Sequence, residues 1–273
     1  MTSAAFSRSS TERVMVNRSS LDVQKSVLFA LLIRELKTRF GRYRLGYAWA
    51  LLEPASHVLV LTAIFSFVFK RTFPGIDFPV FFIVAIVPYQ MFNNMVTQGM
   101  NAISANKGLF GYRQVKTADT LIARMALEGL IHLATLIVLL LCAAWVGYRV
   151  ELNDPLKLLA ALIALYIFNC GCALIACVAV TLYEETQKFL PMLLRPMYFI
   201  SGVIFPLSVV PADYRVYVIW NPLLHAIELI RDACFASYET VGGSWQYLSM
   251  ASVSMLCFGL ILYRHNATRL LMQ

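Results

Sequence analysis

The sequence predicts an all-α integral membrane protein. Of its 273 residues, 59% are hydrophobic and only 14% are charged, whereas soluble domains contain roughly 45–50% apolar and about 25% charged residues. Apolar runs of about 20 residues, long enough to cross a bilayer as helices, recur along the chain. The basic residues that give a net charge of +8 flank these runs. Membrane orientation and anionic lipid therefore explain them better than nucleic acid does.

The N-terminal part divides into a tail and a surface helix. Residues 1–26 are rich in Ser and Arg and lack the apolar core of a signal peptide, which predicts a mostly disordered cytoplasmic tail. Residues 27–45 predict an amphipathic helix that lies on the membrane, because four apolar side chains recur at i, i+4 spacing beside basic ones. The apolar row is Leu28, Leu32, Leu36 and Phe40, and the basic side is Arg34, Lys37, Arg39, Arg42 and Arg44.

Residues 46–273 form the predicted transmembrane domain, with six helical spans. They lie near Trp49–Phe69, Val80–Met100, Met125–Gly147, Leu158–Leu182, Phe189–Phe205 and Gln246–Tyr263. This layout puts 17 Lys and Arg residues on one side of the membrane and six on the other. By the positive-inside rule, both termini are cytoplasmic.

The connection between the fifth and sixth spans predicts a re-entrant segment at about 207–240. It is too short for two further crossings, yet much of it is apolar. Pro206 and Pro211 interrupt it, and Asn221 followed by Pro222 is typical of a helix start. We expect two short helices that dip into the outer leaflet and return; the alternative is an amphipathic helix lying flat on the outer surface.

Ionisable residues near the spans have both structural and functional interpretations. Glu128 and His132 are one turn apart and could relay protons, but interhelical hydrogen bonding is the favoured interpretation. Glu228, Arg231 and Asp232 fall on the second short helix, where the spacing allows Glu228 to neighbour either Arg231 or Asp232; they indicate a structural polar face rather than a catalytic pair. The sequence lacks the GxxxxGK[ST] phosphate loop and HExxH spacing, so we expect no catalytic residue, no metal site and no nucleotide hydrolysis by this chain.

The basic residues before the first span leave two alternatives open. Arg39, Arg42 and Arg44 could bind the phosphate of an amphiphilic substrate, since guanidinium groups bind phosphate with two hydrogen bonds. Ordinary binding to anionic phospholipid would use the same chemistry.

The run RELKTRFGRYRLGYAWALLEP, the six-span layout and the segment WNPLLHAIELIRD together resemble a known family. They are similar to the membrane subunit of capsular-polysaccharide ABC exporters, which are type-2 ABC export permeases of the bacterial inner membrane. The resemblance runs from about Leu28 to the C-terminus. It implies a homodimer with a channel at its interface and two ATP-binding cassette subunits that carry ATP and Mg. It also implies a lipid-linked acidic polysaccharide as substrate, together with periplasmic and outer-membrane export partners.

The resemblance also assigns roles to residues. Arg39, Arg42 and Arg44 become headgroup contacts on the cytoplasmic side. Contacts to the ATPase are implied for Glu35 in the interface helix, for the connection after the second span and for the connection after the fourth span. Those two connections contain Asn106, Lys107, Gly108, Leu109 and Phe110, and Glu184 and Glu185, respectively. The exit region would include Pro206, Pro211, Asn221, Pro222, Glu228 and Arg231.

Two rival functions stay open at this point. An O-antigen or teichoic-acid exporter permease shares the same architecture. A membrane enzyme acting on lipid-linked sugars is a different class, and it would need a cluster of acid, base or metal ligands at a membrane face.

Overall fold

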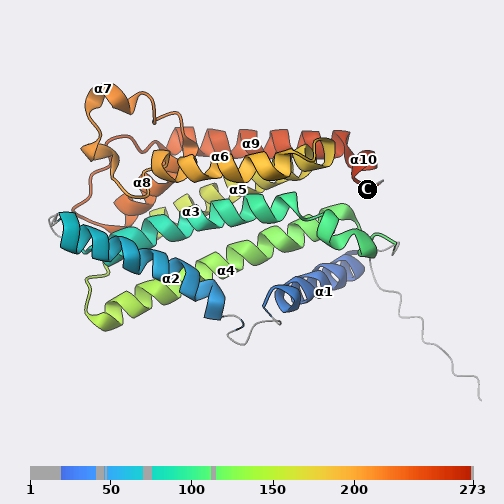
Figure 1. The fold of residues 1–273 in the computed structure, drawn as a ribbon, viewed down its shortest axis with the longest axis horizontal. Coiled ribbons are helices and arrows are strands. Elements are labelled where there is room, and N and C mark those ends of the chain that lie inside the picture. Colours follow the sequence, from blue (N-terminus) through green and yellow to red (C-terminus); the bar gives the residue numbers. More distant parts are fainter. Residues whose placement is uncertain (1–19, 41–45, 47, 70–75, 112–114, 272–273) are drawn as a thin grey trace, which may run out of the picture.

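The computed structural model describes residues 20–40, 46, 48–69, 76–111 and 115–271. The regular structure of these residues is helical (Figure 1). The α-helices are α1 (Ser20–Phe40), α2 (Ala48–Ala63), α3 (Phe78–Met100), α4 (Thr117–Val146), α5 (Pro155–Leu182), α6 (Thr186–Ile200), α7 (Ala212–Arg215), α8 (Pro222–Cys234), α9 (Trp245–His265) and α10 (Ala267–Leu271). A π-helix, η1 (Ile64–Phe69), continues α2, and two 3-10 helices are η2 (Ser104–Leu109) and η3 (Leu207–Val209).

Four of these helices, α3, α4, α5 and α9, are long and apolar enough to cross a membrane. The all-helical membrane class is therefore confirmed. The remaining expected spans are shorter: α2 contributes the apolar helix Leu51–Ala63, and the 15 residues of α6 extend only about 22 Å. The count of six spans and the cytoplasmic termini stay predictions.

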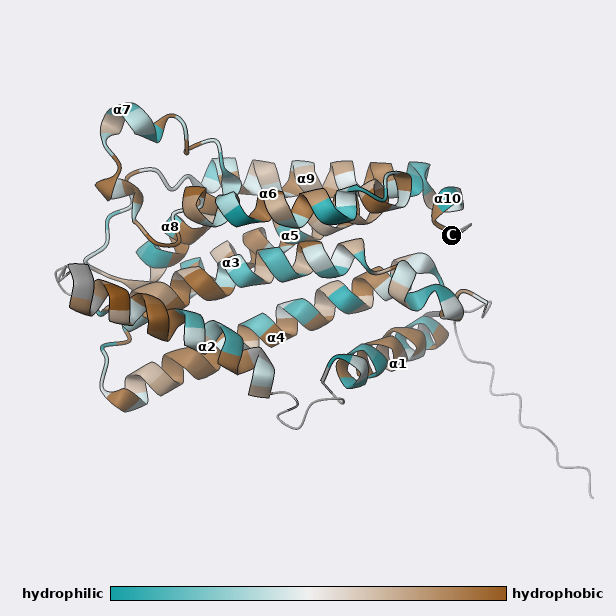
Figure 2. Cartoon of the chain, in the orientation of Figure 1, coloured by the Kyte–Doolittle hydropathy of each residue, from teal (hydrophilic) through white to brown (hydrophobic). Residues whose placement is uncertain are grey.

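Helix α3 is the centre of the bundle, and most of its residues are buried. It packs against α2, α4, α5, α6 and α8, so its apolar character reflects contact with other helices rather than with lipid. In Figure 2, hydrophobic residues gather on α2 and on the C-terminal half of α4, whereas hydrophilic residues gather near α1 and the C-terminus of the chain. The end of the bundle near α1 is therefore more polar than the parts of α2 and α4 that lie away from it.

Helices α5 and α9 approach each other closely along two glycines. A Cβ atom on Gly171 would lie 2.5 Å from the backbone carbon of Met255, and one on Gly259 would lie 2.8 Å from the carbonyl oxygen of Gly171. Ser252 Oγ also donates to the carbonyl of Ala164 at 2.8 Å. Small residues and hydroxyl groups of this kind are how apolar helices associate within a membrane.

The predicted start of the amphipathic helix is wrong. Helix α1 begins at Ser20 rather than at residue 27, so residues 20–26 are helical and not part of a disordered tail. Asp22 lies in the first turn, where its negative charge stabilises the helix by interacting with the positive end of the helix dipole. The predicted span near Met125–Gly147 falls on α4, which begins eight residues earlier, at Thr117, with turns that pack against α1.

The connection between α6 and α9 confirms the predicted helix start. Asn221 caps α8 by accepting from the Leu223 amide at 3.0 Å, and Pro222 occupies the first turn. The first of the two expected short helices is only the four-residue α7, preceded by η3. Helix α8 is buried on nearly every side against α3, α5 and α9. Whether α8 dips into the outer leaflet or lies at the outer surface stays a prediction.

Candidate functional site

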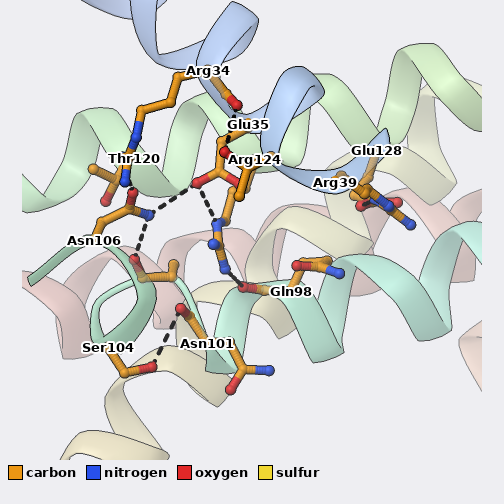
Figure 3. Close-up of polar contacts among 12 residues, drawn as sticks. Arg34, Glu35, Arg39, Gln98, Asn101, Ser104, Asn106, Thr120, Arg124 and Glu128 are labelled. Carbon is orange, nitrogen blue, oxygen red and sulfur yellow. Dashed lines mark hydrogen bonds and ion pairs between the residues drawn. The ribbon is translucent and has the colours of Figure 1, made fainter. Parts of the chain in front are cut away.

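Helix α1 lies along the N-terminal half of α4 (Figure 1), and a polar network holds it there. Arg124 of α4 donates from Nε to Glu35 Oε1 of α1 at 3.0 Å. Asn106 of η2 donates from Nδ2 to the same oxygen, also at 3.0 Å. One carboxylate oxygen thus joins three elements, as Figure 3 shows.

Asn106 is the centre of this network, and its side chain is only 1% exposed. Its Oδ1 accepts from Arg34 Nη1 at 2.6 Å, and its Nδ2 also donates to the carbonyl of Ala102 at 2.9 Å. The amide therefore satisfies its buried polar atoms through α1 and its own turn. Arg34, Glu35, Asn106 and Arg124 are called the α1 network below.

The network continues into the end of α3. Arg124 Nη1 donates to the carbonyl oxygen of Gln98 at 3.2 Å, so this arginine bridges α1 and α3 from its place on α4 (Figure 3). A polar cavity of about 190 Å³ lies between these helices. It is lined by Glu35, Thr38, Arg39, Gln98, Arg124, Leu127 and Glu128.

A second ion pair fastens the C-terminal part of α1. Arg39 donates to Glu128 of α4, whose side chain is 2% exposed. Burial lowers the pKa of Arg39 from its ordinary value. Arg39 therefore faces the bundle in this structure, and its role as a headgroup contact stays a prediction. Arg42 and Arg44, predicted with it, lie outside the described residues.

Glu128 and His132 form interhelical hydrogen bonds, as the favoured interpretation predicted. The Nδ1–H of His132 donates to the carbonyl of Glu128 at 2.8 Å, and its Nε2 accepts from Asn94 of α3 at 3.2 Å. This arrangement fixes His132 as a neutral tautomer with both nitrogens engaged. The pair joins α3, α4 and, through Arg39, α1.

The remaining expected coupling residues lie at the same end of the bundle. Lys107 and Gly108 are exposed at the tip of η2, and Leu109 and Phe110 are partly buried. Glu184 and Glu185 are exposed in the turn between α5 and α6. Gln187, just beyond that turn, donates to Asn101 Oδ1 at 2.8 Å. The two connections predicted to contact a partner are therefore neighbours in space.

The expected exit residues surround a second, fully buried polar cluster at the opposite end. Arg231 lies 3.6 Å from Glu228, donates to the carbonyls of Gly202 and Val203, and stacks over the ring of Phe81. Glu228 in turn accepts from the Leu207 amide, which follows Pro206, and from the hydroxyls of Tyr238 and Thr240. Pro211 precedes α7. The structural interpretation of the Glu228–Arg231 pair is confirmed, but the pair is buried rather than on an exposed face.

Sequence reasoning gave no site role to Arg34, Arg124 or Gln187. The sequence pattern places Arg34 on the basic side of the surface helix and gives Arg124 no role beyond the excess of basic residues on the cytoplasmic side. Two signals could have identified the network: Glu35 is an acidic residue within a basic helix, and Arg124 precedes Glu128 by one helical turn. Which helix each would meet is a tertiary fact.

An apolar helical bundle with a charged amphipathic helix fastened to one polar end defines a multi-pass integral membrane protein. More specifically, the chain belongs to the ABC-2 type transporter family, which matches residues 26–235.

Three relatives extend this assignment. The polysialic acid transport protein KpsM of Escherichia coli is 45% identical over 247 residues, covering 90% of this chain and 96% of that protein. The capsule polysaccharide export inner-membrane protein CtrC of Neisseria meningitidis is 28% identical over 241 residues, covering 88% and 91%. The protein of the same description, BexB, of Haemophilus influenzae is 26% identical over 255 residues, covering 91% and 94%. The expected resemblance and the inner-membrane location are confirmed.

Proposed function

We propose that this chain is the membrane subunit of an ATP-driven exporter that moves a lipid-linked acidic capsular polysaccharide from cytoplasm to periplasm. Two copies would form the channel at their interface. Two separate ATP-binding cassette subunits would bind ATP and Mg, and periplasmic and outer-membrane proteins would continue the path. The names of the relatives, which describe capsule polysaccharide export and polysialic acid transport, support the substrate class.

The α1 network is the observation that carries this proposal. It ties an amphipathic surface helix to η2 and to α4, a helix long enough to span the membrane. A force applied to α1 or η2 from the cytoplasm would therefore reach a transmembrane helix through partly buried, charge-assisted bonds. ATP shifts a conformational equilibrium only through different affinities for the two states, and this network is where such a difference would act.

The topology belongs to the proposal as well. With α2 plus η1 and α6 added to the four long helices, the chain crosses six times and both termini are cytoplasmic, as the distribution of Lys and Arg favours. Helix α8 and the turns before it would then dip into the membrane from the outside. Its cover of protein on nearly every side is what backbone at that depth requires.

Arg39, together with Arg42 and Arg44, is our proposed contact for the substrate phosphate. In this structure Arg39 is paired with Glu128. Phosphate binding would replace this carboxylate at the guanidinium group, since both anions accept the same paired hydrogen bonds. Substrate arrival would then loosen the attachment of α1 to α4.

The test is charge reversal at the exposed tips, with Lys107→Glu and Glu184→Lys. Exposed ion pairs contribute about 0.2–1 kcal/mol each, and reversal turns such an attraction into repulsion of similar size. We expect polysaccharide export to fall severalfold while membrane insertion is unchanged. Surface polysaccharide and ATP hydrolysis by the reconstituted complex measure export and its coupling, and the accessibility of cysteines introduced into the loops measures membrane insertion.

Glu151→Lys is the matched control, because Glu151 is exposed at the opposite end of the bundle. Export that is equal in all three variants and the unaltered protein would contradict the coupling assignment. Export activity that needs no ATPase subunit would contradict the proposed function as a whole.

A further inference from the structure

A groove of about 390 Å³ lies between α3, α4 and α5. Its rims are apolar side chains that are largely exposed: Leu130 and Leu133 on α4 are 56% and 43% exposed, and Leu159 and Ile163 on α5 are each 51% exposed. The groove therefore opens sideways, on the surface that faces hydrocarbon when these helices cross a membrane.

The groove exists because α4 and α5 both pack along α3 but touch each other only locally. Gly129 and Tyr166 make that local contact. A Cβ atom at Gly129 would lie 2.6 Å from Cε2 of Tyr166, so only glycine lets the tyrosine ring approach α4 so closely. The ring closes one part of the groove, and Pro88 and Met91 of α3 form part of its lining.

The side chains that line the groove are mainly apolar, which favours a hydrocarbon occupant. Among the described residues that line the groove, none is an Asp, Glu, Lys or Arg. His132 contributes to the wall, but its two nitrogens are engaged by Glu128 and Asn94. The groove thus offers few polar atoms to an occupant, and a charged or strongly polar ligand would lose its hydration there without compensation.

The position of the groove matches the depth of lipid chains. On α4 its lining runs from Ala126 to Leu136, about 15 Å of helix axis in the central part of a 30-residue helix. The hydrocarbon core of a bilayer is about 30 Å thick. The volume lies within the range of about 300–1,000 Å³ typical of ligand sites.

We propose that this groove holds one acyl chain of a membrane phospholipid, which packs between α4 and α5 as a fixed part of the folded protein. The size favours a single flexible chain over a helix from a second copy, because the groove encloses only about 390 Å³ and extends along about 15 Å of α4. Lipid chains are as apolar as leucine side chains, so binding in the groove gains nothing from removal of apolar surface from water. The chain is held by the van der Waals contacts that it makes on filling the void.

The acyl chain would contact α4 next to the residue through which α4 binds α1. Glu128, which binds Arg39 of α1, and Gly129, which borders the groove, are consecutive residues of α4. A chain packed against this turn restrains the helix that α1 pulls on. The inference depends on membrane insertion and not on the identity of the exported substrate.

The experiment uses the full chain in vesicles of phosphatidylethanolamine and phosphatidylglycerol that contain a phospholipid with a photoreactive diazirine in its acyl chain. One sample is irradiated in vesicles and a second only after transfer to detergent, and the adducts in each are mapped to peptides by mass spectrometry. We expect peptides that contain Met91 and Tyr166 to be labelled in both samples, whereas the exposed Leu141 is labelled in vesicles but not after the bulk lipid has been removed.

Ala126→Phe and Leu133→Phe are two independent variants that fill the groove, and Leu141→Phe is the control on an exposed part of α4 outside it. A monodisperse gel-filtration peak shows which variants fold. We expect the groove adducts formed in detergent to fall to the level at Leu141 in either filling variant and to be unchanged in the control.

Two outcomes would overturn the proposal. One is groove labelling that is lost in detergent as completely as labelling at Leu141, which would show ordinary surrounding lipid. The other is crosslinking of a photoreactive residue at Leu133 to a second copy of the chain, which would show that protein covers the groove.

Discussion

Replacing Glu35 with glutamine tests the α1 network most directly. Glu35 Oε1 accepts from Arg124 and from Asn106, each at 3.0 Å. Glutamine keeps the length of the side chain and one carbonyl oxygen but removes the negative charge. Arg124, whose side chain is 9% exposed, then lies against a neutral partner.

The magnitude follows from the two bonds. A hydrogen bond to a charged group contributes about 1.5–3 kcal/mol and a neutral one about 0.5–1.5 kcal/mol. Removing the charge therefore weakens the Asn106 bond by about 1 kcal/mol. Arg124 loses its ion pair and keeps a bond to a neutral oxygen, which costs about 1 kcal/mol more, so the docking of α1 on α4 and η2 weakens by about 2 kcal/mol in total. That corresponds to a roughly thirtyfold shift toward undocked α1.

Labelling of a single thiol measures this shift. Leu31 of α1 is 5% exposed, so a cysteine in its place, with the native cysteines replaced, reacts only when α1 leaves the bundle. We expect Glu35→Gln to accelerate labelling roughly thirtyfold and to reduce ATP-driven export. Lys37→Gln, an exposed position on the same helix, should leave the labelling rate unchanged.

Equal labelling rates in the Glu35→Gln variant and its control would refute the reasoning. A double-mutant cycle with Arg124→Gln adds a second criterion, because residues in one network are non-additive by about 0.5–3 kcal/mol. Strict additivity of the two substitutions would show that this contact does not hold α1.

Two further predictions concern stability in detergent, measured as the temperature of irreversible loss of the monodisperse protein. Glu228→Gln should destabilise the chain by about 3–5 kcal/mol, because it leaves fully buried Arg231 without its anion. Asp232→Asn is the control on the same helix. Equal destabilisation by the two substitutions would argue against the Glu228–Arg231 pair. Gly171→Ala should cost about 1–3 kcal/mol through overpacking, since its Cβ meets the α9 backbone at 2.5 Å, whereas Gly108→Ala, with nothing within 4 Å, should be neutral. A Gly171→Ala protein as stable as the Gly108→Ala protein would contradict the close helix approach.

The amphipathic helix illustrates how far a pattern can be followed. The spacing of Leu28, Leu32 and Leu36 indicated a helix with one apolar face, and these side chains are partly buried in the structure. Its start was misplaced because residues 20–26 are polar and resemble a tail. In the structure these residues are helical. Gln24 donates from Nε2 to Asp119 Oδ1 of α4 at 3.5 Å, and a partner so distant in the sequence cannot be identified from the local pattern.

The candidate site was predictable in part. Glu35 and Asn106 were expected to contact a partner from resemblance alone, and nothing in their local sequence indicated that they bind each other. Similarly, the spacing of Glu228 and Arg231 allowed them to be neighbours on a structural polar face of one helix. Their burial depends on the turns around Gly202 and Leu207, which provide the remaining hydrogen bonds.

The sequence by itself determined that the chain is helical, that it resides in a membrane and where α8 begins, because these properties depend on composition, on runs of apolar residues and on local capping. Only the tertiary structure decided that Arg39 faces Glu128, that Asn106 joins α1 to η2, and that α4 and α5 separate to leave a groove. Such pairings depend on which helix faces come together, and long-range packing fixes that choice, whereas periodicity gives only the face.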